Sequence, residues 1–303
     1  MTLTTLRTAL AAGALTLALG QAVSAQDLRI AYTGYSTDNT FWIGVAEAAA
    51  AEAEAQGVEF IDMTASSPDS AAQKDAVDRA IDMGVDGIII GSVDNRAFDA
   101  SLDAAAERGI PVVAVDTAID HPHVASLVQT DNLAAAGIAG DYIVGQMGEG
   151  KVLILGGSAG HQTGEARRDG VLNAAEAAGH EVIFQICDWQ DACAFETTTN
   201  FLQSDPAITA IFSAWDPGAL AAVSAAKALG RLDDLVIVGF DGNPANLVAI
   251  AEGEQSATIK QDNTRMGTES VQNLLALIRG EPVEAMVPID GILITDENVA
   301  DYQ

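Results

Sequence analysis

The chain has 303 residues, of which 49% are hydrophobic, and its 14 Lys and Arg against 43 Asp and Glu give a formal net charge of −29. This acidity makes nucleic acids and anionic lipid surfaces poor partners, because phosphate binding requires clustered cations. The length is sufficient for two domains with separate hydrophobic cores.

The first 25 residues have the three-part pattern of a secretory signal peptide. A positive charge stands at Arg7, an apolar stretch covers 9–19, and Ala-Val-Ser-Ala occupies 22–25. A membrane anchor is the weaker interpretation, because the apolar stretch is shorter than the roughly 20 residues that a bilayer crossing needs. We therefore predict cleavage after Ala25 and a mature protein that is free in the periplasm.

Short strands rich in β-branched residues alternate with helices along the rest of the chain. In the first half we expect strands at 28–33, 58–63, 87–92, 111–116 and 125–128, and helices at 41–56, 71–84 and 97–109. A second series follows, with strands at 151–155, 181–186, 208–214 and 235–240, and helices at 163–178, 195–203, 218–229 and 244–252. The tail adds a helix at 264–279 and strands at 285–289 and 292–295. Alternation of this kind gives a parallel sheet with helices on both faces, so we predict an α/β protein of two Rossmann-like lobes.

Aromatic and polar residues follow the predicted strands. All three tryptophans, Trp42, Trp189 and Trp215, stand after strands and beside Asp or Asn residues. Open parallel sheets bind ligands beyond the carboxyl ends of their strands. Flat rings that stack on C–H faces, next to groups that bond hydroxyls, suit a sugar or a sugar alcohol. For each ring alone, packing at a domain edge is the alternative interpretation.

The two cysteines, Cys187 and Cys193, stand six residues apart in a chain that we predict to be exported. A disulfide is favoured over free thiols in that setting. No further Cys or His stands near them at ligand spacing, so no metal site is predicted.

An enzymatic alternative rests on Ser158, which lies in a G-x-S-x-G sequence between a strand and a helix. The histidines after it, His161 and His180, come too early in the second domain to be the base of a triad. The segment 145–151 resembles a P-loop, but Val152 replaces the Ser or Thr that would bind magnesium. We therefore expect no catalytic residue and no cofactor, and a serine hydrolase is the less favoured function.

Six motifs carry a resemblance to a known family. They are DNTFW at 38–42, IPVVAVD at 110–116, TDN at 130–132 followed by IAGDYI at 138–143, RRDG at 167–170, VGFDG at 238–242 and ATIKQD at 257–262. In their order and spacing, the whole mature chain resembles the type I periplasmic binding proteins, especially the ribose-binding branch of ABC sugar-uptake systems. This resemblance implies lobes joined by three crossovers, near Thr130, Gln261 and Pro288, which close on a sugar without catalysis.

The resemblance also implies the ligand-binding residues. From the first lobe they are Asn39, Phe41, Trp42 and Asp116, and from the second lobe Arg167, Trp189, Asp241 and Gln261. Trp215, which also follows a predicted strand, completes the predicted set of ligand contacts. Three positions depart from the ribose-binding pattern. Gly91 and Trp215 each stand where an Asn is expected, and Asp191 stands where a second Arg is expected. Because the pocket loses polar contacts and gains bulk, we expect a pentose, a small polyol or a deoxy sugar rather than a plain hexose.

The same resemblance implies the domain organisation and the partners. We expect a first lobe of 26–130 with 262–288, and a second lobe of 131–261 with 289–303. The expected protein is a monomer that delivers its solute to an ABC permease in the inner membrane. A chemoreceptor is a further candidate partner, and a binding module for a non-sugar signal molecule is the alternative function.

Overall fold

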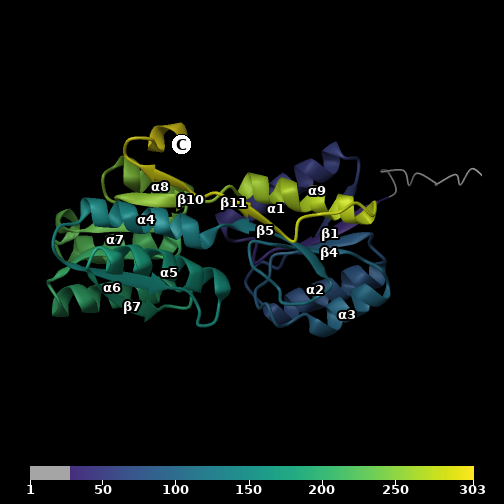
Figure 1. The fold of residues 1–303 in the computed structure, drawn as a ribbon, viewed down its shortest axis with the longest axis horizontal. Helices are drawn as coiled ribbons and strands as arrows, with labels where there is room; N and C mark the ends of the chain where they lie inside the picture. Colours follow the sequence, from purple (N-terminus) through teal and green to yellow (C-terminus); the bar gives the residue numbers. More distant parts are fainter. Residues whose placement is uncertain (1–27) are drawn as a thin grey trace, which may run out of the picture.

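Two six-stranded sheets, each covered by helices, make up residues 28–303, the part of the chain that the computed structural model describes. Figure 1 shows the two lobes side by side, connected by a narrow bridge of chain. The predicted signal peptide, 1–25, lies outside the described residues. Among residues 28–303, no helix has both the length and the hydrophobicity that a membrane crossing requires.

The first lobe contains a wholly parallel sheet in the order β11-β5-β4-β3-β1-β2. Its strands are β1 (Arg29–Thr33), β2 (Glu59–Asp62), β3 (Gly87–Ile90), β4 (Val112–Val115), β5 (Val124–Thr130) and β11 (Met286–Ile289). Its helices are α1 (Thr40–Ala55), α2 (Ser70–Met83), α3 (Asp99–Glu107) and α9 (Asn263–Ile278). In Figure 1, α1 and α9 lie on one face of this sheet and α2 and α3 on the other. Because both faces are covered, β3 and β4 are buried at every residue, as is usual for parallel strands.

The second lobe repeats the architecture around a sheet in the order β12-β10-β9-β8-β6-β7. Its strands are β6 (Lys151–Gly156), β7 (Glu181–Ile186), β8 (Ile208–Ser213), β9 (Val236–Asp241), β10 (Ala257–Lys260) and β12 (Ile292–Thr295). Its helices are α4 (Asn132–Gln146), α5 (Gln162–Ala177), α6 (Asp191–Ser204), α7 (Asp216–Ala228) and α8 (Pro244–Ala251), with short 3-10 turns at Leu232–Asp234 and Val299–Asp301. The edge strand β12 runs antiparallel to β10, whereas every other pair in this sheet is parallel.

The chain passes between the two sheets three times. The passages come after β5, after β10 and between β11 and β12. This confirms the predicted fold class of two α/β lobes with a hinge of three segments. Ile289 still pairs with Thr130 in the first sheet, one residue beyond the boundary that we predicted at 288. The division into lobes at single residues stays a prediction.

Candidate functional site

A cavity of about 400 Å³ lies between the lobes, where the carboxyl ends of the strands of both sheets meet. All the residues that the sequence predicts as ligand contacts line it: Asn39, Phe41, Trp42, Asp116, Arg167, Trp189, Trp215, Asp241 and Gln261. The structure therefore brings the whole predicted set together. Contact of these residues with a ligand stays a prediction.

The start of α1 forms the first-lobe wall. The Asn39 side chain caps this helix, because its Oδ1 accepts hydrogen bonds from the backbone N–H groups of Phe41 at 2.9 Å and Trp42 at 3.4 Å. The Trp42 ring stacks on that of Tyr35, with centroids 6.3 Å apart, and meets the ring of Phe41 edge to face. This packing fixes the direction in which the indole faces the cavity.

Trp42 also explains why residue 91 is a glycine. A Cβ atom on Gly91 would overlap the six-membered ring of Trp42. The asparagine that the resemblance leads one to expect at this position therefore cannot stand beside Trp42 in this packing. The departure at residue 91 thus exchanges a polar side chain for an aromatic surface.

Trp189 lies on the opposite wall, in the loop that the disulfide closes. Cys187 and Cys193 are bonded, with Cα atoms 5.3 Å apart, which confirms the predicted disulfide. The Trp189 ring lies so close over Gly157 that no Cβ would fit there. The Trp189 ring packs nearly perpendicular to two neighbouring rings. Its centroid lies 5.3 Å from that of His161 and 5.8 Å from that of Trp215.

Opening the disulfide is expected to destabilise the protein and loosen Trp189. Replacing both Cys187 and Cys193 with serine should lower the free energy of unfolding by about 2 kcal/mol, because the bond closes a short loop. Urea unfolding measures this change, and tryptophan fluorescence reports on the cavity because all three tryptophans line it. Reductant should produce the same shift in the wild-type protein and none in the double variant. Equal stabilities with and without the bond would contradict the prediction.

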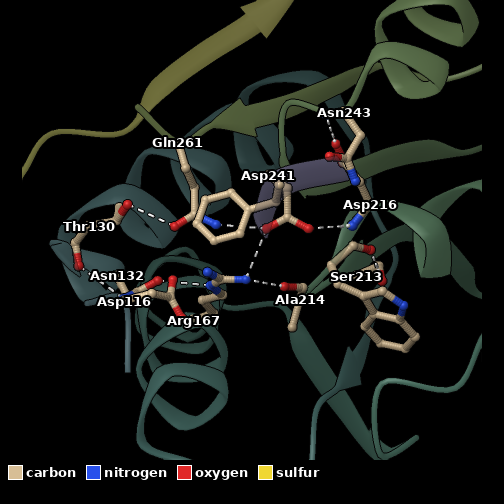
Figure 2. A network of polar contacts seen from close by, with 12 residues as sticks. Asp116, Thr130, Asn132, Arg167, Ser213, Ala214, Asp216, Asp241, Asn243 and Gln261 are labelled. Carbon is tan, nitrogen blue, oxygen red and sulfur yellow. Dashed lines mark hydrogen bonds and ion pairs between the residues drawn. The ribbon is translucent and has the colours of Figure 1, made fainter. Parts of the chain in front are cut away.

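Arg167 is the centre of a buried polar network on the second-lobe side (Figure 2). Its Nε donates to Asn132 Oδ1 at 2.8 Å, and its Nη1 donates to the carbonyl oxygen of Ala214 at 2.8 Å and to Asp241 Oδ1 at 3.3 Å. The guanidinium also lies over the Phe240 ring, with Cζ 3.9 Å from the centroid. These contacts hold the planar group in one orientation at the cavity wall.

The network extends to two of the three connecting segments. Gln261, directly after β10, donates from Nε2 to Asp241 Oδ1 at 2.8 Å and accepts from Thr130 Oγ1 at 2.8 Å. Thr130 is the last residue of β5. A cavity residue is thus hydrogen-bonded to a hinge residue, so the position of one lobe is linked to the groups that line the site.

Backbone strain concentrates at this site. Among residues 28–303, the non-glycine residues with φ between 49° and 137° are Asp116, Asp188, Trp189 and Asp241. Asp188 precedes Trp189 in the disulfide loop, and the others line the cavity. Such conformations cost about 1–3 kcal/mol each and persist mainly at functional sites.

Two carboxylates in the network are unusually basic because they are buried. Burial, together with the smaller effect of the nearby charge of Asp241, raises the pKa of Asp216 to about 7. Burial also raises the pKa of Asp241 to about 6, against the opposing effect of the Arg167 charge. Asp216 is held by Thr258 Oγ1 and by the backbone N–H of Asn243, which donate to it at 2.6 Å each.

Ser158 and the histidines that follow it are not assembled into a catalytic triad in the described chain. Ser158 is half-buried in the loop after β6, and no hydrogen bond joins its Oγ to a histidine within the described chain. His180 Nδ1 instead lies 3.2 Å from the carbonyl oxygen of Gly150. For the same residues, no group of three or more His, Cys, Asp or Glu side chains could hold a metal ion.

Several lining residues were not among the predicted contacts. They include Ser36, Asp38, Thr163, His161 and Gln190. His161 is not predicted as a ligand contact, although it follows β6 at the carboxyl edge of the second sheet, where Trp189 and Trp215 also lie. His161 and Thr163 stand only a few residues beyond the end of β6, and ligands bind beyond the carboxyl ends of parallel strands. This position is the signal in the sequence that points to both residues. Asp38 immediately precedes the predicted Asn39.

Comparisons with known proteins agree with this geometry. A family model described as a periplasmic binding protein domain matches residues 30–282. The ribose import binding protein RbsB of Haemophilus influenzae is 30% identical over 282 residues, 92% of this chain and 95% of the relative. An ABC transporter solute-binding protein from Mycobacterium smegmatis with bound glycerol has 29% identity and a TM-score of 0.83, over 90% of this chain and 96% of that one. One from Bacillus halodurans C-125 with bound myo-inositol has 28% identity and a TM-score of 0.82, over 92% and 98%.

Proposed function

Because the chain belongs to the family of periplasmic binding protein domains, we propose that it is the solute-binding protein of an ABC importer. Its solute is a monosaccharide of pentose type or a small sugar alcohol, held in the cavity between the lobes. After removal of residues 1–25 the protein acts in the periplasm as a monomer. It carries out no covalent chemistry.

The observation that carries this proposal is that each lobe contributes a tryptophan to the same cavity. Trp42 of the first lobe and Trp189 of the second lobe line one cavity, together with the network around Arg167. Rings stack on the apolar faces of a sugar ring or polyol, and the carboxylates and guanidinium bond its hydroxyls. The glycerol and myo-inositol in the two related structures support a polyol as the class of solute.

Closure of the lobes converts binding into a transport signal. A solute that contacts both walls binds the closed arrangement more tightly, so it shifts the population toward closure. Gln261 assists this coupling, because it contacts both Asp241 at the cavity and Thr130 at the hinge. The closed form is the one that the inner-membrane permease recognises, and a chemoreceptor is a second candidate partner for this form.

A thermal-shift screen of residues 26–303 tests the proposal. The panel contains pentoses, hexoses, deoxy sugars, tetritols and pentitols. A solute at about 100 times its Kd should add roughly 2.7 kcal/mol of stability, which raises the Tm visibly. A shift confined to a pentose or polyol is the expected result, whereas tightest binding of glucose or galactose would remove the pentose or polyol assignment. A flat response from folded, ligand-free protein would favour a non-sugar signal molecule instead.

A further inference from the structure

The cavity wall carries more negative charge than positive. Asp38, Asp116, Asp191 and Asp241 line it, whereas Arg167 is the only Lys or Arg among the described lining residues. Arg167 is paired with Asp241 at 3.3 Å. The other three carboxylates form no ion pair with any residue of the described chain. Burial lowers the pKa of His161 and thus disfavours the positively charged form of its ring.

Three hydrogen-bond donors of the cavity are already bonded to its carboxylates. Trp215 Nε1 already donates to Asp191 Oδ1 at 2.9 Å, and Gln261 Nε2 already donates to Asp241. Thr117 Oγ1 donates to Asp116 Oδ2 at 2.8 Å. The second oxygens of Asp116 and Asp191 accept no hydrogen bond within residues 28–303. These three donors are thus already bonded to carboxylates, while one oxygen each of Asp116 and Asp191 remains without a donor.

Asp116 is the most deeply buried of the three carboxylates without an ion pair. Only 6% of this residue, which lines the cavity, is exposed, and its Oδ1 accepts no hydrogen bond from residues 28–303. A charge that loses water without gaining a partner costs free energy, and closure of the lobes removes more of the water. A neutral polyol offers hydroxyl hydrogens but leaves the excess charge uncompensated. An ammonium group offers three donors, no acceptor and one positive charge.

We propose that the solute carries a protonated amino group, so that it is an amino sugar or an amino polyol whose ammonium binds at the unpaired carboxylates Asp38, Asp116 and Asp191. The inference rests on the proposed function, because it takes the cavity as the solute site. The remaining hydroxyls of such a solute accept hydrogen bonds from Arg167 Nη2, which forms none within the described chain, and its C–H faces stack on the aromatic walls.

Calorimetric titration of matched pairs tests this assignment. Each pair differs by one group: glycerol and 3-amino-1,2-propanediol, D-glucose and D-glucosamine, D-galactose and D-galactosamine, and myo-inositol and an inositol with one hydroxyl replaced by an amine. At low ionic strength, the tightest-binding amine should bind at least about tenfold more tightly than its hydroxyl counterpart. N-acetylation, which removes the charge, should abolish this advantage.

The outcomes separate the inference from the proposed function. If hydroxyl compounds bind as tightly as their amines in every pair, the amine assignment is wrong while the carrier function stands. If no compound of either kind binds to folded, ligand-free protein, the proposed sugar or polyol function fails as well.

Three single substitutions locate the ammonium. Asp38→Asn, Asp116→Asn and Asp191→Asn each remove one charge with little change of shape, and Asn tolerates the positive φ of residue 116. At least one of them should lower the ratio of amine to hydroxyl affinity by about fivefold or more. Asp233→Asn, an exposed site on the 3-10 turn of the second lobe, makes the same change of net charge and should leave the ratio unaltered. An amine preference that survives all three cavity substitutions would overturn the role of these carboxylates.

Discussion

Replacing Arg167 with methionine is expected to lower the free energy of unfolding by about 3 kcal/mol and to abolish measurable solute binding. Methionine fills much of the same volume but supplies no donor. Asp241 would keep its buried position without a cation, and Asn132 Oδ1 and the Ala214 carbonyl oxygen would lose the N–H groups that now reach them. The cavity would also lose its only Lys or Arg side chain among the described lining residues.

Arg168→Met is the matched control, because Arg168 is the next residue on the same helix. Its ion pair with Asp169, at 2.7 Å, is partly exposed, and its guanidinium lies 5.2 Å from the Phe184 ring centroid. Loss of such a surface pair should cost less than about 1 kcal/mol. Urea unfolding and calorimetric titration of both variants make the comparison. Similar losses in the two variants would show that the buried network around Arg167 has no special importance.

The solute-free protein is expected to become more stable as the pH falls from about 8 to about 5, by about 2 kcal/mol or more. Asp216 and Asp241 have raised pKa values in the folded protein, about 7 and about 6, against 3.8 for the ordinary carboxyl group. Between these limits Asp216 and Asp241 bind more protons in the folded state than in the unfolded state, so their contribution to stability increases as protons are added. The gain ends near pH 4, where both states are protonated.

Comparison of pH profiles isolates this pair from the general acidity of the chain. Asp216→Asn removes one of the two buried titrations, so its free energy of unfolding should change less steeply with pH than that of the wild type. Its absolute stability is not the readout, because the amide cannot accept from both Thr258 and Asn243 as the carboxylate does. Asp233→Asn should keep the wild-type slope. Parallel profiles for wild type and Asp216→Asn would contradict the raised pKa values.

Much of the fold could be predicted from sequence because local signals agree with burial. The strands GIII at Gly87–Ile90 and VVAV at Val112–Val115 are continuous apolar runs, and the structure buries them on both faces. Helix ends are marked as well. Gly84 directly follows α2 and adopts φ of 64°, which a glycine accepts without strain. We assigned no strand to 257–260, however, because four residues between a turn and a helix carry little periodicity.

The candidate site likewise combines residues that the sequence predicts with contacts that only the folded structure shows. Residues at strand ends, such as Trp42 and Trp215, follow from the general location of ligands in parallel sheets. Their mutual packing does not, because the fit of Trp42 over Gly91 joins residues far apart in the sequence. The bond from Arg167 to Asn132 depends likewise on how α5 packs against α4. The unbalanced charge of the cavity becomes visible only once pairing partners are known.

The threefold passage of the chain between lobes sets the order in which the cores can form during synthesis. Helix α9 contributes Met266, Val271 and Leu274 to the core of the first lobe, and β11 completes its sheet beside β5. A ribosome therefore releases nearly the whole chain before the first core is complete, and β12 leaves the second sheet open until later still. The core that α9 completes in the first lobe therefore forms only after the core residues of the second lobe, Ala135–Ile259, have been synthesised. The order in which the two cores are completed is thus the reverse of the order in which the two lobes begin in the sequence.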